Sequence, residues 1–173
     1  QISGLKDTRI DISGRLRGLP DMNNLGADLA IKNISSSQRD IALFVPRGTL
    51  PNNITLPAKI NLSGKLNGNA GNLATNLLLK TSLGNASVKG TMRQISDSKK
   101  SSYDLQLNTA SLDLGTILQN KNNLGPVSAD LHIKGNGYDT KTANASLTGK
   151  IKSAIIKQYE YRDLNMKGTI ADQ

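Results

Sequence analysis

A short alternating pattern recurs along this chain and limits what the chain can fold into. Apolar and polar residues alternate, and a glycine occupies one of the apolar places, as in Ile10-Asp-Ile-Ser-Gly-Arg-Leu16. The pattern returns, whole or in part, at residues 60–66, 86–92, 131–135, 145–151 and 164–170. Because successive side chains of a β-strand point to opposite faces, strict alternation is typical of a half-buried strand. The sequence therefore predicts an all-β fold.

The glycine of each copy falls on the same strand face as the aliphatic residues. A glycine on the inner face leaves a gap where a strand can bend, so a set of glycines in phase predicts a curved antiparallel sheet. An alternative is that each glycine marks a bulge in an ordinary β-sandwich. The strand-bend glycines are Gly14, Gly64, Gly90, Gly135, Gly149 and Gly168, and the polar-face neighbours are mostly cationic: Arg15, Lys65, Lys89, Lys134, Lys150 and Lys167.

The remaining segments show weaker periodicity. A short helix is predicted at 113–120, where Leu114, Ile117 and Leu118 follow a helical spacing behind a capping Asp113. Looser strands are predicted at 25–34, 41–45, 73–83 and 103–112, and turns rich in Gly, Asn, Asp or Ser at 67–72, 96–102 and 136–139.

The interior must be built from small and aliphatic side chains. Aromatic residues make up 3% of the 173 residues, with no Trp and one Phe. Such side chains form a smooth surface, which suits an elongated groove. Because the sequence begins at Gln1 without an apolar leader, we expect residues 1–173 to be a single segment excised from a longer protein.

Catalytic and metal-binding residues are not expected. The chain has no cysteine and one histidine, which excludes the usual zinc sites. The carboxylates of Asp11, Asp28, Asp104 and Asp130 alternate with apolar neighbours, so they should face water, as should His132. General acid–base chemistry needs titratable groups in a shielded cleft. We therefore expect neither an enzyme nor a cofactor.

The net charge of +9 invites comparison with nucleic-acid-binding proteins. The cations are dispersed, and the five aromatic rings are too scattered to form a base-stacking platform. Nucleic acid is therefore not an expected partner. The basic face could be a simple solvated surface, and contact with anionic lipid headgroups is a second hypothesis.

The second half of the chain resembles a known family. Residues 112–118, 123–137, 145–152 and 161–170 resemble TamB, the translocation and assembly module, in a Bacteroidetes-type version. TamB is grouped with AsmA-like proteins, and the resemblance covers 103–172. It implies a long periplasmic β-sheet, folded lengthwise into a hydrophobic groove or β-taco, whose parent protein is anchored in the inner membrane of a Gram-negative bacterium.

The same resemblance implies a function. The family is associated with phospholipid transport between the inner and outer membranes and with outer-membrane protein assembly. The implied partners are phospholipid acyl chains, together with an outer-membrane barrel-assembly protein or a nascent outer-membrane protein. A chain of about sixteen carbons would cost roughly 13 kcal/mol to expose to water, at about 0.8 kcal/mol per CH₂, so an aliphatic groove would remove most of that cost.

The residues expected to line the groove are the aliphatic members of the repeated pattern. Two alternatives stay open: a passive structural or adhesive β-sandwich, and a chaperone that binds nascent outer-membrane strands by β-augmentation. The groove-lining residues are Ile10, Ile12, Leu16, Ile60, Leu62, Leu66, Val88, Met92, Leu131, Ile133, Leu147, Ile151, Leu164, Met166 and Ile170.

Overall fold

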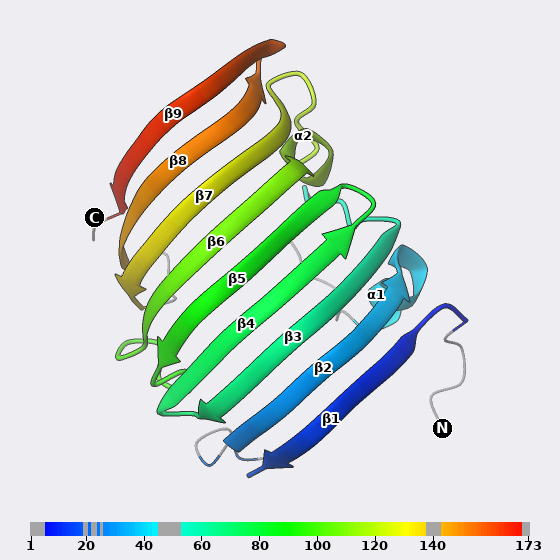
Figure 1. Ribbon diagram of the computed structural model, residues 1–173, viewed down its shortest axis with the longest axis vertical. Coiled ribbons are helices and arrows are strands. Elements are labelled where there is room, and N and C mark those ends of the chain that lie inside the picture. Colours follow the sequence, from blue (N-terminus) through cyan, green and yellow to red (C-terminus); the bar gives the residue numbers. More distant parts are fainter. Residues whose placement is uncertain are drawn as a thin grey trace.

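The chain forms one nine-stranded antiparallel sheet whose strand order follows the sequence (Figure 1). The computed structural model describes residues 6–18, 21, 24, 26–44, 53–137 and 143–170. Each strand pairs with the next, so the first and last strands are the edges. The strands are β1 (Arg9–Arg17), β2 (Gly26–Ser37), β3 (Lys59–Asn69), β4 (Asn72–Thr81), β5 (Gly84–Arg93), β6 (Ser102–Asp113), β7 (Leu124–Asn136), β8 (Asn144–Ile156) and β9 (Tyr159–Ile170).

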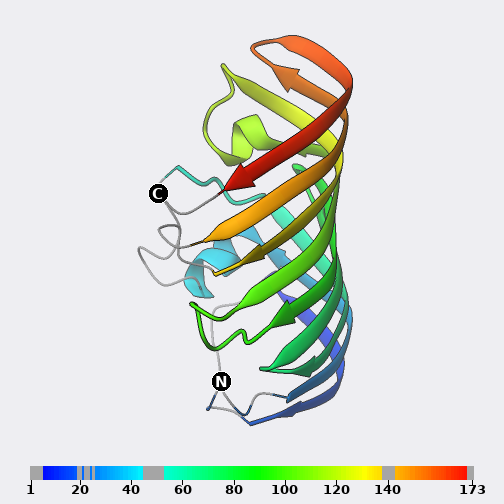
Figure 2. The same cartoon turned by 90° about the vertical axis from the view of Figure 1, so that its left-hand side faces the viewer.

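The sheet is curved and open. Figure 2 shows the strands bending in profile around a concave side, where two short helices lie, α1 (Gln38–Phe44) and α2 (Leu114–Ile117). This confirms the prediction of an elongated, curved antiparallel sheet. The described residues contain no second sheet, so within them the aliphatic face is not buried against another sheet as it would be in a sandwich.

Burial alternates along the strands and identifies the concave face. In β4, Leu73, Leu77 and Leu79 are half-buried and Thr75 is buried, whereas the residues that alternate with them are exposed. β8 has the same alternation from Asn144 to Ile151. Side chains inside a curve converge and shield one another, while those outside diverge into water. The aliphatic face is therefore the concave one.

The repeated glycine allows neighbouring strands to approach closely. Gly64 has a φ of +138°, and a Cβ placed there would lie 2.1 Å from the carbonyl oxygen of Asn76 on β4. Only glycine can occupy such a position without moving the adjacent backbone. Gly14, Gly90 and Gly149 share the positive φ and the same kind of contact. These four positions require a glycine for the close approach of the adjacent strand, and the role of the glycines in bending the strands stays a prediction.

Gly135 and Gly168 differ from the other four glycines in what a Cβ would meet. A Cβ on Gly135 would lie 2.6 Å from the hydroxyl oxygen of Tyr103, so the ring on β6 accounts for this glycine. A Cβ on Gly168, in the edge strand β9, would meet nothing within 4 Å. No neighbouring atom in the described chain requires a glycine there.

Helix α1 corrects the prediction of a strand at 41–45; Val45 lies outside the described residues. The hydroxyl of Ser37 accepts a hydrogen bond from the backbone N–H of Asp40 at 3.4 Å, across the first turn of the helix. Ser37-Gln-Arg-Asp40 thus resembles a capping box, a signal that precedes the apolar run. Without this cap, the aliphatic residues that follow favour a strand; the cap is the feature that favours a helix.

Helix α2 confirms the predicted short helix in a shorter form. The carboxylate of Asp113 accepts hydrogen bonds from the backbone N–H of Thr116 at 2.9 Å and from its hydroxyl at 2.6 Å.

The predicted turns agree with the structure in part. The predicted turn at 67–72 was too long, because strand pairing continues to Asn69 and resumes at Asn72. The turn before β6 is confirmed. Beyond Gly137, the predicted turn at 136–139 lies outside the described residues.

A bulge in β2 explains why this strand lacked clear alternation. Ile31 is in register with Gly64, whereas Ile34 is in register with Leu62, although the two isoleucines are three positions apart. The extra residue returns both side chains to the concave face, which a strict period of two would not allow.

Candidate functional site

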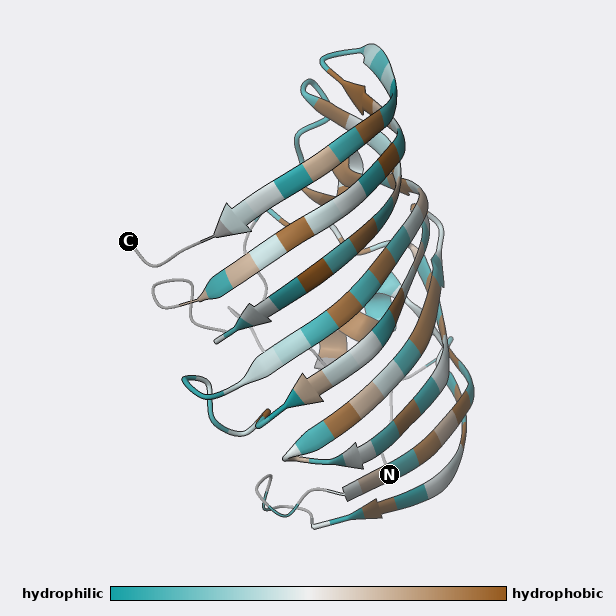
Figure 3. Ribbon diagram, turned by 60° about the vertical axis from the view of Figure 1, so that its left-hand side comes forward, coloured by the Kyte–Doolittle hydropathy of each residue, from teal (hydrophilic) through white to brown (hydrophobic). Residues whose placement is uncertain are grey.

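The concave face carries continuous cross-strand rows of mainly aliphatic residues. The register joins residues from all nine strands into a central row. At about 4.8 Å between strands, that row spans roughly 38 Å. Figure 3 shows hydrophobic positions recurring along the successive strands. The central row is Ile12, Ile31, Gly64, Leu77, Val88, Leu107, Leu131, Gly149 and Met166.

The register brings the predicted groove-lining residues together. One row joins Ile10, Leu62, Ile151 and Leu164 through intervening strands. Ile12, Val88, Leu131 and Met166 belong to the central row. Leu66, Ile133 and Leu147 share a third row, Leu16 and Met92 belong to a fourth, and Ile60 pairs with Ser36 and Thr81 near the strand ends. The backbone of Ile170 is in register with Ala145, in the fourth row.

Several concave-face residues were not predicted as groove-lining. In Leu77-Leu-Leu79, all three residues are apolar, so periodicity alone could not separate inner from outer positions. The register places Leu78 opposite Ser63 and Ser87, on the convex face. The other missed residues are Leu29, Ile31, Ile34, Leu73, Leu105 and Leu107.

Large aliphatic side chains on this face remain accessible. The buried apolar residues of the described chain are Ile31 and four alanines. The edge strands are the most open, with Ile10 64% and Leu16 47% exposed on β1, and Leu164 and Met166 each 38% exposed on β9. Within the described residues no second sheet covers these side chains, so the concave face presents an apolar surface.

One end of the concave side is partly covered. The backbone N–H of Thr55 donates a 2.7 Å hydrogen bond to the carbonyl of Ile117, which ties the segment leading into β3 to the end of α2. Gly115 of α2 is buried, and a Cβ there would lie 1.9 Å from the carbonyl oxygen of Leu124 on β7. These contacts hold the segment and α2 together at the same end of the strands.

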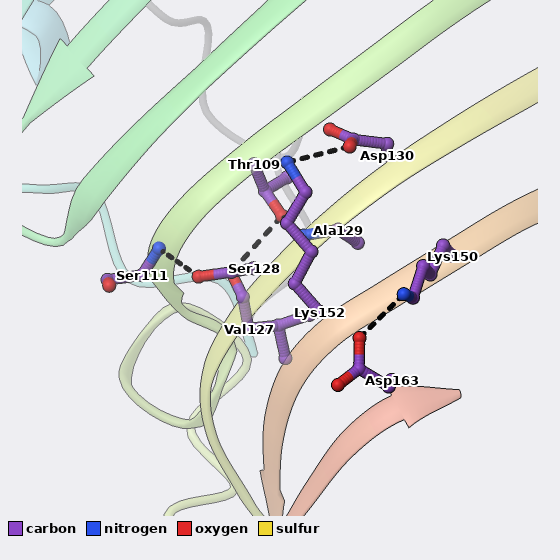
Figure 4. A network of polar contacts seen from close by, with 9 residues as sticks. All are labelled: Thr109, Ser111, Val127, Ser128, Ala129, Asp130, Lys150, Lys152 and Asp163. Atoms are coloured by element: carbon purple, nitrogen blue, oxygen red, sulfur yellow. Dashed lines mark hydrogen bonds and ion pairs between the residues drawn. The ribbon is translucent and has the colours of Figure 1, made fainter. Parts of the chain in front are cut away.

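The convex face carries ion pairs between strands. Lys152 pairs with Asp130 and Lys150 pairs with Asp163, each at 2.6 Å (Figure 4). Beside them, the hydroxyl of Thr109 accepts from the backbone of Ala129 and donates to the carbonyl of Val127, where the β6–β7 register shifts. Aspartates therefore lie between the lysines of the convex face.

The carboxylates of this face lie in water, as the sequence predicted. Asp104 Oδ1 lies 2.6 Å from His132 Nε2, and the ammonium of Lys134 lies 3.7 Å from its other oxygen. The hydrogen bond with His132 holds the pKa of Asp104 below its ordinary value. Both partners are about half exposed, so this pair is open to solvent.

The described residues contain no cluster of acids or histidines able to hold a metal ion. Within the same ranges, neither helix has the length and apolar character needed to cross a bilayer. No protein-family model, curated protein or solved structure matches this chain.

Proposed function

We propose that this chain shields lipid acyl chains on its concave face, as a periplasmic segment of a TamB-like protein anchored in the inner membrane. In this function it carries phospholipid between the inner and outer membranes, supports outer-membrane protein assembly, or does both. It acts without catalysis and without a cofactor. Its ligand is the hydrocarbon part of the lipid, and a barrel-assembly protein or nascent outer-membrane protein is a further partner.

The main support is the aliphatic face, which no second sheet covers within the described residues. Its central row crosses every strand and contains no charged side chain. Its large side chains carry no opposing sheet within the described ranges. Contiguous exposed apolar surface of this kind is uncommon on soluble proteins and marks binding surfaces for lipid or protein.

The energetics favour an elongated apolar ligand. Burial of apolar surface is worth about 25 cal/mol per Å², and it needs no specific geometry. A face lined by Leu, Ile, Val and Met can therefore accept a chain in many positions along its length. Glycine positions such as Gly64 and Gly149 keep two places in the central row free of side-chain bulk.

Photo-crosslinking in the intact cell envelope tests this proposal. The full-length parent protein carries a photoreactive residue either at Ile133 or at His132, neighbours on β7 that lie on opposite faces. The adducts are identified by mass spectrometry. We expect lipid adducts at Ile133 and none at His132. Equal labelling of both positions, or none at Ile133 in protein that accumulates normally, would contradict the proposal.

Strand addition is a second candidate, supported by the two sheet edges. β1 and β9 are nine and twelve residues long, and each pairs on one side only. Unpaired backbone groups at an edge are a template for an incoming strand. A peptide copied from an outer-membrane protein strand should slow amide hydrogen exchange in β1 or β9. Unchanged exchange at saturating peptide would count against this candidate.

A further inference from the structure

A cationic hollow lies near one end of the first four strands. It encloses about 690 Å³ and is lined by residues from the segment before β1 and from β1 to β4. Four of its residues are cationic, Lys6, Arg9, Lys59 and Lys80, and one is acidic, Asp7. Most of its other residues carry hydroxyl or amide groups: Ser35, Ser36, Ser37, Asn61, Thr81 and Ser82.

The cations of the hollow make no close ion pair among the described residues. On the convex face, Lys134, Lys150 and Lys152 each lie within 4 Å of an aspartate. Among the described residues, none of the four cations of the hollow makes such an ion pair. Their charge is therefore available to an external anion.

The strand register explains why these cations converge. Asn61 is in register with Lys80, so Lys59, two residues away on the same face, is the diagonal neighbour of Lys80. Diagonal neighbours across a strand pair lie about 7–8 Å apart, within reach of two flexible ammonium groups for one ligand. Arg9 enters the same cross-strand row through Ser35 and Asn61.

A buried carboxylate anchors the segment before β1, which carries Lys6 and Asp7 of the hollow. Asp40 in α1 is fully buried, and its Oδ2 accepts hydrogen bonds from the backbone N–H of Asp7 and from the hydroxyl of Thr8, both at 2.9 Å. The hydroxyls of Thr8 and Ser36 lie 2.8 Å apart. These contacts hold the segment that carries Lys6 against the end of β2.

We infer that this hollow binds a phosphate group. The tetrahedral, multiply charged oxygens of phosphate match a guanidinium, several ammonium groups and neutral hydroxyl donors arranged around one space. The phosphate can belong to a lipid headgroup or to a free phosphate ion, because the shared chemistry is the same. This inference is independent of acyl-chain binding, because it depends on the cations of the hollow and not on the central aliphatic row.

Calorimetric titration with inorganic phosphate, at constant ionic strength, tests the site directly. The variant Lys59→Gln/Lys80→Gln removes the diagonal pair. A matched control, Lys99→Gln/Lys100→Gln, removes the same charge from exposed lysines in the turn at the other end of the strands. We expect saturable binding that weakens at least tenfold in the first variant and less than twofold in the control.

Vesicle co-sedimentation identifies the source of the phosphate. The wild-type chain and both variants are mixed with vesicles of phosphatidylglycerol or of phosphatidylcholine. Loss of vesicle binding in Lys59→Gln/Lys80→Gln alone, together with the phosphate result, assigns the site to a lipid headgroup. Phosphate binding without any such difference on vesicles assigns it to a free phosphate. Absence of saturable phosphate binding, or equal weakening in both double variants, would overturn the inference and leave only a diffuse basic surface.

Discussion

The carboxylate of Asp40 and the hydroxyl of Thr8 lie 2.9 Å apart, and this contact ties α1 to the chain that enters the edge strand β1. The two residues are separated by 32 positions in the sequence. Asp40 also accepts from the backbone N–H of Asp7, so a single buried side chain holds the end of the edge strand in place.

Asp40 predicts a loss of stability in acid. The hydrogen bond from the N–H of Asp7, with that from Thr8, holds the pKa of Asp40 below its ordinary value. A carboxyl group whose pKa is lowered by folding stabilises the fold above its unfolded pKa of about 3.9, and this contribution disappears as the pH falls through the folded value. Asp40→Asn should therefore be less stable than wild type at pH 7, and the difference should shrink below about pH 4.

Urea unfolding at pH 7 and pH 3 measures that difference. Amide hydrogen exchange at Asp7 and Thr8 should also accelerate in Asp40→Asn, while exchange in β7 should not. A stability difference that is constant over this pH range would show that the charge of Asp40 is not what stabilises the contact.

Replacing Gly64 by alanine should lower the free energy of unfolding, whereas the same substitution at Gly168, at the same point of the repeated pattern, should not. In Gly64→Ala, the new Cβ would lie 2.1 Å from the carbonyl oxygen of Asn76, at a φ that alanine avoids. Backbone strain and displacement of β4 should lower the free energy of unfolding by about 2–4 kcal/mol. Gly168→Ala places a Cβ at the same point of the repeated pattern, where nothing lies within 4 Å. It should change stability by less than about 0.5 kcal/mol.

Urea midpoints for the two glycine variants, compared at equal m-values, give the answer. Equal costs at Gly64 and Gly168 would mean that the close approach of β3 and β4 is not what requires the glycine.

Leu77 and Leu78 predict a face-specific effect on lipid binding. Leu77 belongs to the central concave row, whereas Leu78 lies on the convex face and is 38% exposed. Leu77→Lys places a charge where the proposed acyl chain lies, and a cost of about 1.4 kcal/mol would weaken binding about tenfold. Leu78→Lys adds the same charge to a face that already carries lysines, so it should have little effect.

Titration with a fluorescent fatty acid measures the affinity of both variants. Circular dichroism establishes that each retains its strand content. Similar affinities for Leu77→Lys and Leu78→Lys would place the acyl chain elsewhere on the protein.

Asp113 predicts a modest, local contribution to stability. Its carboxylate accepts both the N–H and the hydroxyl of Thr116, which caps α2. Loss of such a cap costs about 1 kcal/mol, so Asp113→Ala should lower the free energy of unfolding by that amount. Asp113→Asn should retain much of this stability, because asparagine is also a good N-cap.

Amide hydrogen exchange at Thr55 provides a local measurement. The N–H of Thr55 bonds to the carbonyl of Ile117 at the end of α2, so it should exchange faster in Asp113→Ala. Unchanged exchange at Thr55 would show that α2 and the segment leading into β3 are held independently.

Periodicity alone predicted much of this protein because the preferences involved are local. The alternation at Ile60–Leu66 required only that successive side chains face opposite ways, and Asp113 needed only the neighbouring backbone to cap a helix. Periodicity failed as a guide where the alternation of apolar and polar residues was interrupted or absent. The bulge between Ile31 and Ile34 changed the phase of β2, and the run around Leu78 was apolar on both faces.

The sequence by itself determined which residues can share a face, since that depends on a strand period of two. Only the tertiary structure decided which of them become neighbours. Strand register brings Lys59 beside Lys80 and links both to Arg9, although Arg9 is about fifty positions from Lys59 in the chain. Register also aligns the central aliphatic row and leaves it without an opposing sheet in the described residues. These outcomes depend on hydrogen bonds and close contacts between distant segments, which no local preference encodes.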